Sequence, residues 1–441
     1  MKRNFYWIIA LFCVTFCASC KKQQNVPEQP QGFFSTEINR LIDANYPEVE
    51  KVGYAELRVP ANLFDQKAFA MPADAAGDMD YVVNAGYVAY VNGGSVRDAI
   101  MGKVPNDVDF TTDATPDQLV EIVPNTTIFT APSGFIVAQA WHGDECTDMG
   151  TMRSIYEYLR GKPRIPESQY EGIFSKSLLE DSYSRDLTIN AIYYDYVTGD
   201  LLDYHGGLHD LREGIIRSFI DPDLVYPQNP SNLLRTVRFA ARFNFTIEPV
   251  TEAGIYKHLP ECDALGASGI AYSVSSGFHD GNMTLTYSLY KKYGILGRYF
   301  LTLSDTLDTE EYNAYAGKVY AYLDAQKCNT VVVNEAALFA PVVQTALAGK
   351  TVTADEVTAT WTRLEQESGQ DQWYEIDEED KADMCQLWYL LSQMSSDDVI
   401  NDSAKAAQVR AAEQFGNAVI LLNAMAQADS RLSKYTAVWN R

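Results

Sequence analysis

The stretch NGGSVRDAIMGKVPNDVDFTTD, residues 92–113, decides the fold class because it joins a glycine turn to two closely spaced acids. The runs YVAYVNGG and DVDF have the pattern of short strands, and VRDAIMG between them has the length of one or two helical turns. Asp107 and Asp109 alternate on the second predicted strand, so we expect both carboxylates on one face, about 7 Å apart at the backbone. Such oxygen ligands suit Mg²⁺, which keeps water and substrate phosphates as its other ligands. An isolated Asp-x-Asp pair is more often a solvated strand end, so its neighbours decide the interpretation.

Four neighbours of this acidic pair favour a phosphate site over a solvated turn. Gly93 and Gly94 allow the backbone to approach a phosphate closely. Arg97 supplies a bidentate positive charge for that phosphate, and Asp98 can orient the arginine. A glycine turn, an arginine and paired acids at this spacing predict a nucleoside-triphosphate site.

Sequence patterns outside this stretch predict a mixed sheet with helices, followed by helices alone. Thr115, Pro116 and Gln118 form the signature of a capped helix in TPDQLVEIV, and the strand-rich run TIFTAPSGFIVAQAW follows it. The pattern changes at Ser231, where SNLLRTVRFAARF predicts an amphipathic helix with a basic face. Helical periodicity then dominates up to Arg441.

The charge of the chain limits its possible partners. The 441 residues carry a formal net charge of −24, and residues 301–441 hold 22 Asp and Glu against 10 Lys and Arg. That balance repels polyphosphate chains and argues against broad non-specific nucleic-acid binding, although a local basic cleft is compatible with it. The apolar content of 46% is enough for two or three domains with proper cores.

The first residues predict export. Lys2 and Arg3 precede the apolar run FYWIIALFCVTF, which is shorter than the roughly 20 residues of a spanning helix. The Ala-Ser dipeptide before Cys20 is similar to a bacterial lipobox, although Cys17 stands where Leu is usual. We therefore predict a lipoprotein of a bacterial envelope, anchored in the membrane by lipid on Cys20 and held off it by a Gln/Pro-rich tether. An ordinary cleaved signal is the alternative.

Three of the seven cysteines lie in the predicted signal, and the remaining four are far apart in the sequence. Their spacing matches neither a metal site nor a disulfide framework, so we expect isolated buried thiols. These four residues are Cys146, Cys262, Cys328 and Cys385.

The order Gly-Gly-x-Val-Arg-Asp, then Gly102, then Asp-x-Asp resembles the head domain of the class II CCA-adding enzyme and bacterial poly(A) polymerase family. These nucleotidyltransferases extend RNA 3′ ends. RDLTINAIYYDYVTGDLLDYHGGLHDLREGIIRSFIDP is similar to the family's second block, and LLRTVRFAARFNFTIEP to its helical neck. The resemblance implies an α+β nucleotidyltransferase head followed by an all-helical neck and body. The predicted divisions are a signal peptide at 1–20, a tether and N-terminal segment at 21–53, a head at 54–200, a neck at 201–265 and a body at 266–441.

The resemblance also implies roles for single residues. Asp107 and Asp109 would hold Mg²⁺, and Asp148 falls where the family places a third acid, which would act as general base on the attacking 3′-hydroxyl. That oxygen would attack the α-phosphate in line, and pyrophosphate would leave. The positions implied to bind the nucleotide are Gly93, Gly94, Arg97, Asp98, Arg153, Arg185, Asp186, Asn190, Arg235 and Arg238. Alternatively, Arg235 and Arg238, three residues apart, form only a solvated helix face.

The chain departs from the family pattern where the family selects its base. The family has Glu-Asp-x-x-Arg there, whereas this chain has Gln228, Asn229 and Asn232. Amide side chains offer both donors and acceptors, so they pair with many base edges and discriminate few. Ser184 replaces the first arginine of the family's Arg-Arg-Asp, and acid replaces the basic character of the body.

Two main hypotheses follow from these patterns. The first is a Mg²⁺-dependent nucleotidyltransferase that uses ATP or another nucleoside triphosphate and an RNA 3′ end, with a degraded base-selection motif. The second is an exported lipoprotein that keeps the fold as a catalytically impaired binding module. Transfer to an acceptor other than RNA is a third hypothesis, and no residue pattern identifies that acceptor.

Overall fold

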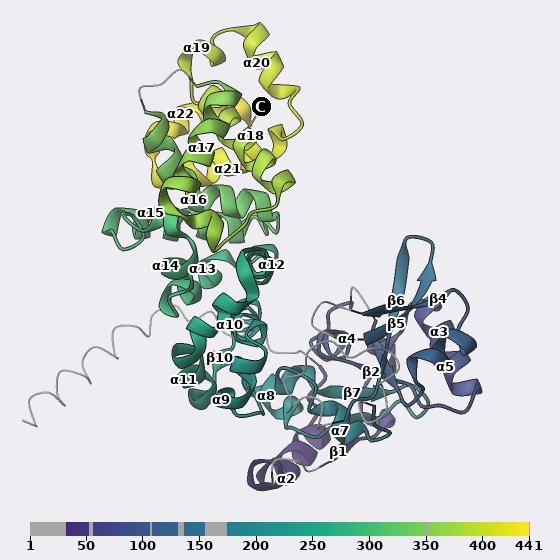
Figure 1. Cartoon of the computed structure of the whole chain (residues 1–441). Helices are drawn as coiled ribbons and strands as arrows, with labels where there is room; N and C mark the ends of the chain where they lie inside the picture. The colour runs from purple at the N-terminus through teal and green to yellow at the C-terminus, as the bar shows by residue number, and fades with distance from the viewer. Residues whose placement is uncertain are drawn as a thin grey trace, which may run out of the picture.

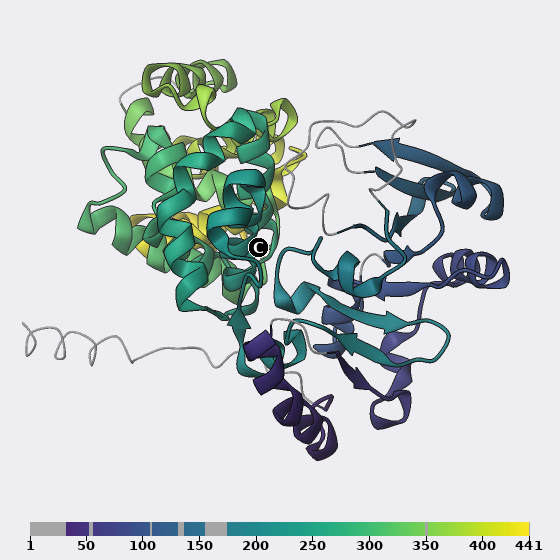
Figure 2. The ribbon, with the colours of Figure 1, turned by 60° about the horizontal axis from the view of Figure 1, so that its bottom comes forward.

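The computed structural model describes residues 32–52, 56–105, 108–130, 136–154, 174–348 and 352–440. The chain forms a sheet-containing head, coloured purple through blue to teal in Figure 1, and a helical part that continues from teal through green to yellow at the C-terminus. Figure 2 shows the head beside the helical part. The predicted signal peptide and Cys20 lie outside the described residues. Within the described ranges, no helix is long and apolar enough to cross a membrane.

The head is built on a mixed sheet of eight strands in the order β1-β8-β7-β2-β3-β6-β5-β4. Neighbouring strands are antiparallel except β3 and β6, which are parallel. Val91, Phe110 and Met149, from three adjacent central strands, are buried in the main core. The strands are β1 (Leu57–Val59), β2 (Tyr90–Asn92), β3 (Phe110–Thr112), β4 (Thr126–Thr130), β5 (Ile136–His142), β6 (Glu145–Thr151), β7 (Ile192–Asp195) and β8 (Leu201–Asp203).

Short helices connect and cover these strands. The predicted capping box is confirmed, because the Thr115 hydroxyl accepts from the Gln118 amide while the Gln118 side chain accepts from the Thr115 amide. β8 and the helix after it lie just past residue 200, where we predicted the head to end, and β8 pairs with both β1 and β7. The helices of this part are α2 (Thr36–Val52), α3 (Ala73–Asn84), α4 (Gly94–Ile100), α5 (Pro116–Ile122), α7 (Leu178–Ser182) and α8 (Gly207–Glu213).

The neck contains α9 (Pro222–Gln228), α10 (Ser231–Phe243) and α11 (Pro249–His258). A two-stranded parallel sheet, β9 (Ile215–Ile216) with β10 (Thr246–Ile247), brackets α9 and α10 in the sequence. The predicted amphipathic helix at Ser231 is confirmed as α10, whose apolar side is fully buried. It ends at Phe243 because Asn244 adopts the left-handed conformation (φ 55°) that asparagine tolerates better than most residues.

The body is helical throughout its described residues, as predicted. Helix α16 is nearly surrounded, and Phe339 on it packs against Trp361, which in turn lies 5.0 Å from the ring of Trp388. The main helices are α12 (Gly266–His279), α13 (Met283–Lys292), α14 (Ile295–Tyr299), α15 (Glu310–Ala325), α16 (Val331–Leu347), α17 (Ala354–Ser368), α18 (Glu378–Met394), α19 (Asp397–Ile400), α20 (Ser403–Arg410), α21 (Phe415–Ala428) and α22 (Ser433–Trp439).

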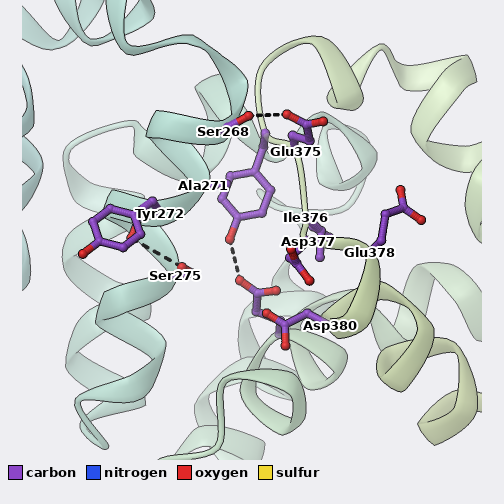
Figure 3. A pocket seen from close by; sticks show the side chains of 11 residues that line it. Ser268, Ala271, Tyr272, Ser275, Glu375, Ile376, Asp377, Glu378 and Asp380 are labelled. Carbon is purple, nitrogen blue, oxygen red and sulfur yellow. Dashed lines mark hydrogen bonds between the residues drawn. The ribbon is translucent and has the colours of Figure 1, made fainter. Parts of the chain in front are cut away.

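A cavity of about 470 Å³ lies in the body between α12 and the start of α18 (Figure 3). Five carboxylates line it, and none of its lining residues is basic: Glu335, Glu375, Asp377, Glu378 and Asp380. Glu335 is only 1% exposed, and its carboxylate accepts a hydrogen bond from the hydroxyl of Tyr374. Burial raises the pKa of Glu335 to about 7.

Two local expectations differ from the structure. β3 begins at Phe110, so Asp109 precedes the assigned strand instead of lying within it, although its carbonyl still accepts from the Asn92 amide at 3.3 Å. Cys146 is exposed, because it lies near the hairpin end of β6 where the sheet meets solvent, whereas the other three cysteines are buried as expected.

Candidate nucleotide-binding site

The glycine turn lies at the end of a central strand. β2 ends at Asn92, and Gly93 turns the chain into α4 with φ 66° and ψ −131°, a conformation that L side chains rarely adopt. A Cβ on Gly93 would meet no atom within 4 Å, so the backbone angle and not crowding requires glycine. The predicted loop is therefore a backbone turn that is open on its outer side.

Sheet register brings two of the predicted acids to neighbouring positions. Phe110 pairs with Met149 across the parallel strands β3 and β6, and Asp109 and Asp148 each come one residue earlier. Adjacent strands lie about 4.8 Å apart, so the two carboxylates start from neighbouring backbone positions. Because Phe110 and Met149 point into the core, alternation directs Asp148 to the opposite face. Asp107 lies outside the described residues, so its position relative to Asp109 stays a prediction.

The acids have the donor chemistry that magnesium prefers. Asp109 is exposed, and Asp148 is half-buried and accepts a hydrogen bond from the Gln139 amide at 3.0 Å. Mg²⁺ is commonly held by one or two carboxylates, with water and phosphate oxygens completing its shell. The described residues contain no group of three or more His, Cys, Asp or Glu able to hold a metal. Asp109 and Asp148 therefore fit part of a magnesium site, whose chemical contribution would be to neutralise phosphate charge.

Arg185, the first residue of the segment that resembles the family's second block, binds the glycine turn through Asn92. Its guanidinium donates to Asn92 Oδ1 and to Asp181 Oδ2, both at 2.8 Å, and to the Tyr193 hydroxyl at 3.3 Å. Asp181 also accepts from the Tyr193 hydroxyl and from the backbone amide of Arg153. Burial alone would lower the pKa of Arg185, but Asp181 and Tyr193 raise it above its ordinary value, so the charge is kept. The Arg153 guanidinium instead donates to a backbone carbonyl, that of residue 136.

A second chain of contacts runs from α4 to the neck. Arg97 is 3% exposed; its guanidinium donates to Asp98 at 2.9 Å and also to Asn190 Oδ1. Asn190 donates to Asp186 at 2.8 Å, and Asp186 accepts from Arg235 Nε at 2.8 Å. Burial would raise the pKa of Asp186, but Arg235 and Asn190 hold it below its ordinary value. Four of the predicted nucleotide-binding residues and their orienting acid thus form one connected network.

Arg97 of α4 and the arginines of α10 lie over aromatic rings of α10. The guanidinium of Arg97 lies 5.1 Å from the ring centroid of Phe239 and 4.8 Å from that of Phe243. Arg235 and Arg238 also lie over Phe239, at 5.2 and 5.7 Å. Cation–π contacts of this kind hold arginine planes in place at modest energy. We call Arg235, Arg238 and Arg242 the arginine row of α10. Each member of the row has a carboxylate partner among the described residues, and binding of a nucleotide by the row stays a prediction.

The three amides at the base-template positions lie where α9 gives way to α10: Gln228 ends α9, Asn229 follows it, and Asn232 is in the first turn of α10. Gln228 and Asn229 are exposed, and Asn229 Oδ1 accepts from the Ser231 hydroxyl at 2.7 Å. Asn232 is 7% exposed on the first turn of α10. The exposed pair is thus available to solvent, while Asn232 is largely covered.

Sequence reasoning missed several residues that shape this site. Asp181, near the end of α7, lies four residues before Arg185, so this spacing of opposite charges was a usable signal. Phe239 and Phe243 have the same spacing on α10. Asp280, which binds Arg238, is 42 residues away from it, and no local pattern connects the two.

Asp109 and Asp148 at neighbouring positions of the central sheet, the glycine turn at Gly93 and the arginine row of α10 define a candidate nucleotide-binding head domain. Residues 89–217 match the family described as the poly(A) polymerase head domain. Poly(A) polymerase I of Salmonella typhimurium is 32% identical over 265 residues, which cover 58% of this chain and 56% of that protein. The CCA-adding enzyme of Bacillus subtilis is 37% identical over 176 residues, 40% of this chain and 42% of that protein.

Solved structures extend the likeness in fold to most of the chain. The CCA-adding enzyme of Bacillus stearothermophilus in complex with CTP has a TM-score of 0.55 at 18% identity, covering 84% of this chain and 82% of that chain. The CCA-adding enzyme of Thermotoga maritima complexed with tRNA has a TM-score of 0.56 at 17% identity, covering 86% and 85%. Residues 89–217 thus form a head domain similar to that of bacterial poly(A) polymerases and CCA-adding enzymes, and most of the chain has the fold of a CCA-adding enzyme. It spans only about half the length of the curated relatives that it matches.

Proposed function

We propose that this protein is a Mg²⁺-dependent nucleotidyltransferase that transfers nucleotides from a nucleoside triphosphate to an RNA 3′ end. The observation that carries the proposal is the position of Asp109, directly before β3 and bonded through its carbonyl to Asn92 at the glycine turn, next to Asp148 on the neighbouring strand β6. The 3′-oxygen bonds to the α-phosphorus, the bond to the leaving pyrophosphate breaks, and Asp148 accepts the hydroxyl proton. Asp107 and Asp109 are the residues proposed to hold the metal.

The arginine row supports binding of the triphosphate. Arg235 donates to Asp186 through Nε, and its side chain is 42% exposed, so its other N–H groups are accessible to phosphate oxygens. Arg97 and Arg185 are held by several contacts each and need little reorganisation before a ligand binds. The amides at 228, 229 and 232 lead us to propose weak discrimination between bases.

Incorporation of labelled nucleotide tests this proposal. The protein lacking residues 1–20 is incubated with Mg²⁺, oligo(A) or tRNA, and each of the four labelled triphosphates in turn. We expect incorporation that varies less than about tenfold among the bases, since neutral amides supply only small energy differences. Asp109→Asn should abolish it, whereas Asp117→Asn, which changes an exposed acid on α5, should not. Incorporation that survives in Asp109→Asn would contradict the proposed site.

A second candidate function is a binding module without turnover, and one observation favours it. The arginines are already paired with the protein's own acids: Arg185 with Asp181, Arg235 with Asp186, and Arg238 with Asp280. Calorimetric titration with ATP and Mg²⁺, combined with the incorporation assay, separates the candidates, because a binding module incorporates no nucleotide even where it binds ATP.

We also propose an envelope location, on the basis of the N-terminal sequence and Cys20 alone. Metabolic labelling with a radioactive fatty acid, followed by fractionation, tests this location. Label on the natural chain that disappears in Cys20→Ala supports the lipid anchor, and an unlabelled protein recovered without membranes argues against it.

A further inference from the structure

Asp280 follows the first body helix, α12, and its carboxylate reaches the arginine row of α10. Its two oxygens accept from Arg238, Oδ2 from Nε at 2.8 Å and Oδ1 from Nη2 at 3.2 Å. Asn282, two residues further on, donates to the carbonyl of Ala241 at 2.8 Å. The side chain of Asp280 is only 6% exposed, so the body contacts α10 at a well-shielded ion pair.

The geometry of this pair leaves part of the guanidinium available. Arginine presents five N–H donors in a rigid plane, and Asp280 occupies the edge formed by Nε and Nη2. Among the described residues, Arg238 makes no hydrogen bond through Nη1. Phe239 lies against the guanidinium, 5.7 Å from centroid to Cζ. A carboxylate on one edge and a ring on the face fix the plane of Arg238 and leave its Nη1 side for another anion.

Arg242 extends this contact from the body into the head. Its Nη1 lies 3.6 Å from Asp280 Oδ1, and its Nη2 lies 3.6 Å from Asp98 Oδ2. Asp98 also binds Arg97 beside the glycine turn. One body carboxylate is therefore linked through Arg242 and Asp98 to an arginine at the candidate site.

We propose that Asp280 is a positioning residue that orients Arg238 toward the triphosphate and thereby makes nucleotide affinity depend on the docking of the body. This inference rests on the proposed function, and it concerns regulation of the same site. An arginine side chain has several rotatable bonds, so without Asp280 its ordering would have to be completed when the nucleotide binds, which weakens affinity.

The test measures ATP affinity, KM and kcat in the protein lacking residues 1–20. Asp280→Asn should raise the Kd and the KM for ATP about tenfold with little change in kcat, and Asp280→Glu should restore most of the affinity. Asp263→Asn is the matched control, because Asp263 makes a comparable two-pronged pair with Arg298, outside the arginine row. The thermal stability of Asp263→Asn should fall by about as much as that of Asp280→Asn, while its KM for ATP stays unchanged.

A double-mutant cycle with Arg238→Lys separates positioning from general damage. If Asp280 acts through Arg238, the losses in ATP affinity for the two changes are not additive. Additive losses, or equal KM values for Asp280→Asn and Asp263→Asn, overturn the inference. If Asp280→Asn does not fold, the same cycle is run with Asp280→Ser, which also removes the carboxylate. If the natural chain binds no ATP, the proposed function itself is wrong. If it binds ATP without turnover, the Kd values of the natural chain and the Asp280 variants still test the positioning role of Asp280.

Discussion

Replacing the buried Glu335 with glutamine should change how the stability of the body depends on pH. The Glu335 side chain lies on α16 at the wall of the acidic cavity, whose lining holds no basic residue. Asp380, which is labelled in Figure 3, lines the same cavity and adds negative charge near Glu335. Burial raises the pKa of Glu335 from 4.5 to about 7, against the smaller lowering effect of the Tyr374 hydrogen bond. The folded state therefore binds this proton more tightly than the unfolded state.

The sign and size of the effect follow from proton linkage. A folded pKa above the unfolded value means that stability is fully present below about pH 4.5 and is lost as pH rises to about 7. A difference of roughly 2.5 pKa units corresponds to about 3 kcal/mol at pH 8. Glutamine cannot lose a proton and can still accept from Tyr374. Glu335→Gln should match the natural chain near pH 4.5 and exceed its stability by up to about 3 kcal/mol at pH 8.

Urea unfolding at a series of pH values, followed by tryptophan fluorescence, measures this difference. Trp361 and Trp388 report on the body because both are buried beside α16. Glu378→Gln, an exposed change on the same cavity rim, is the control and should show no such pH trend. The reasoning would be refuted if the difference in unfolding free energy between Glu335→Gln and the natural chain were constant from pH 4.5 to pH 8.

Two further predictions concern packing and exposure. Gly207→Ala places a Cβ 2.2 Å from the Thr188 carbonyl oxygen, so we expect a loss of more than about 2 kcal/mol of unfolding free energy. Gly77→Ala, inside α3 with open space around the new Cβ, should instead gain about 0.5–1 kcal/mol; a destabilised Gly77→Ala would show that the space is not free. For the thiols, we expect the folded chain lacking residues 1–20 to react with a thiol reagent at Cys146 alone, and the unfolded chain to react at four sites. Burial raises the pKa of Cys262 to about 12 and that of Cys385 to about 11, which lowers their reactivity further. Rapid labelling of more than one thiol before unfolding would contradict the burial of the other three.

Local patterns predicted the parts of the fold that depend on short stretches of chain. Thr115 and Gln118 are three residues apart, so their mutual capping is visible in the sequence. The turn at Gly93 and the helix α10 follow in the same way from neighbouring residues.

Contacts between distant residues were not visible in this way. Arg97 meets Asn190 across 93 positions, and Arg185 meets Asn92 across the same separation. The resemblance to a family brought these residues together as a set, but their pairing with one another depends on strand register. The boundary of β3 was missed because the ladder is short and its pairing with β2 and β6 begins only at Phe110.

The small parallel sheet in the neck has a mechanical consequence. Ile215 and Ile216 pair with Thr246 and Ile247, and the amide of Glu248 continues the ladder to Ile216. The segment carrying α10 is thus fastened at both ends to the strand that leaves the head, so α10 cannot pivot without breaking that ladder.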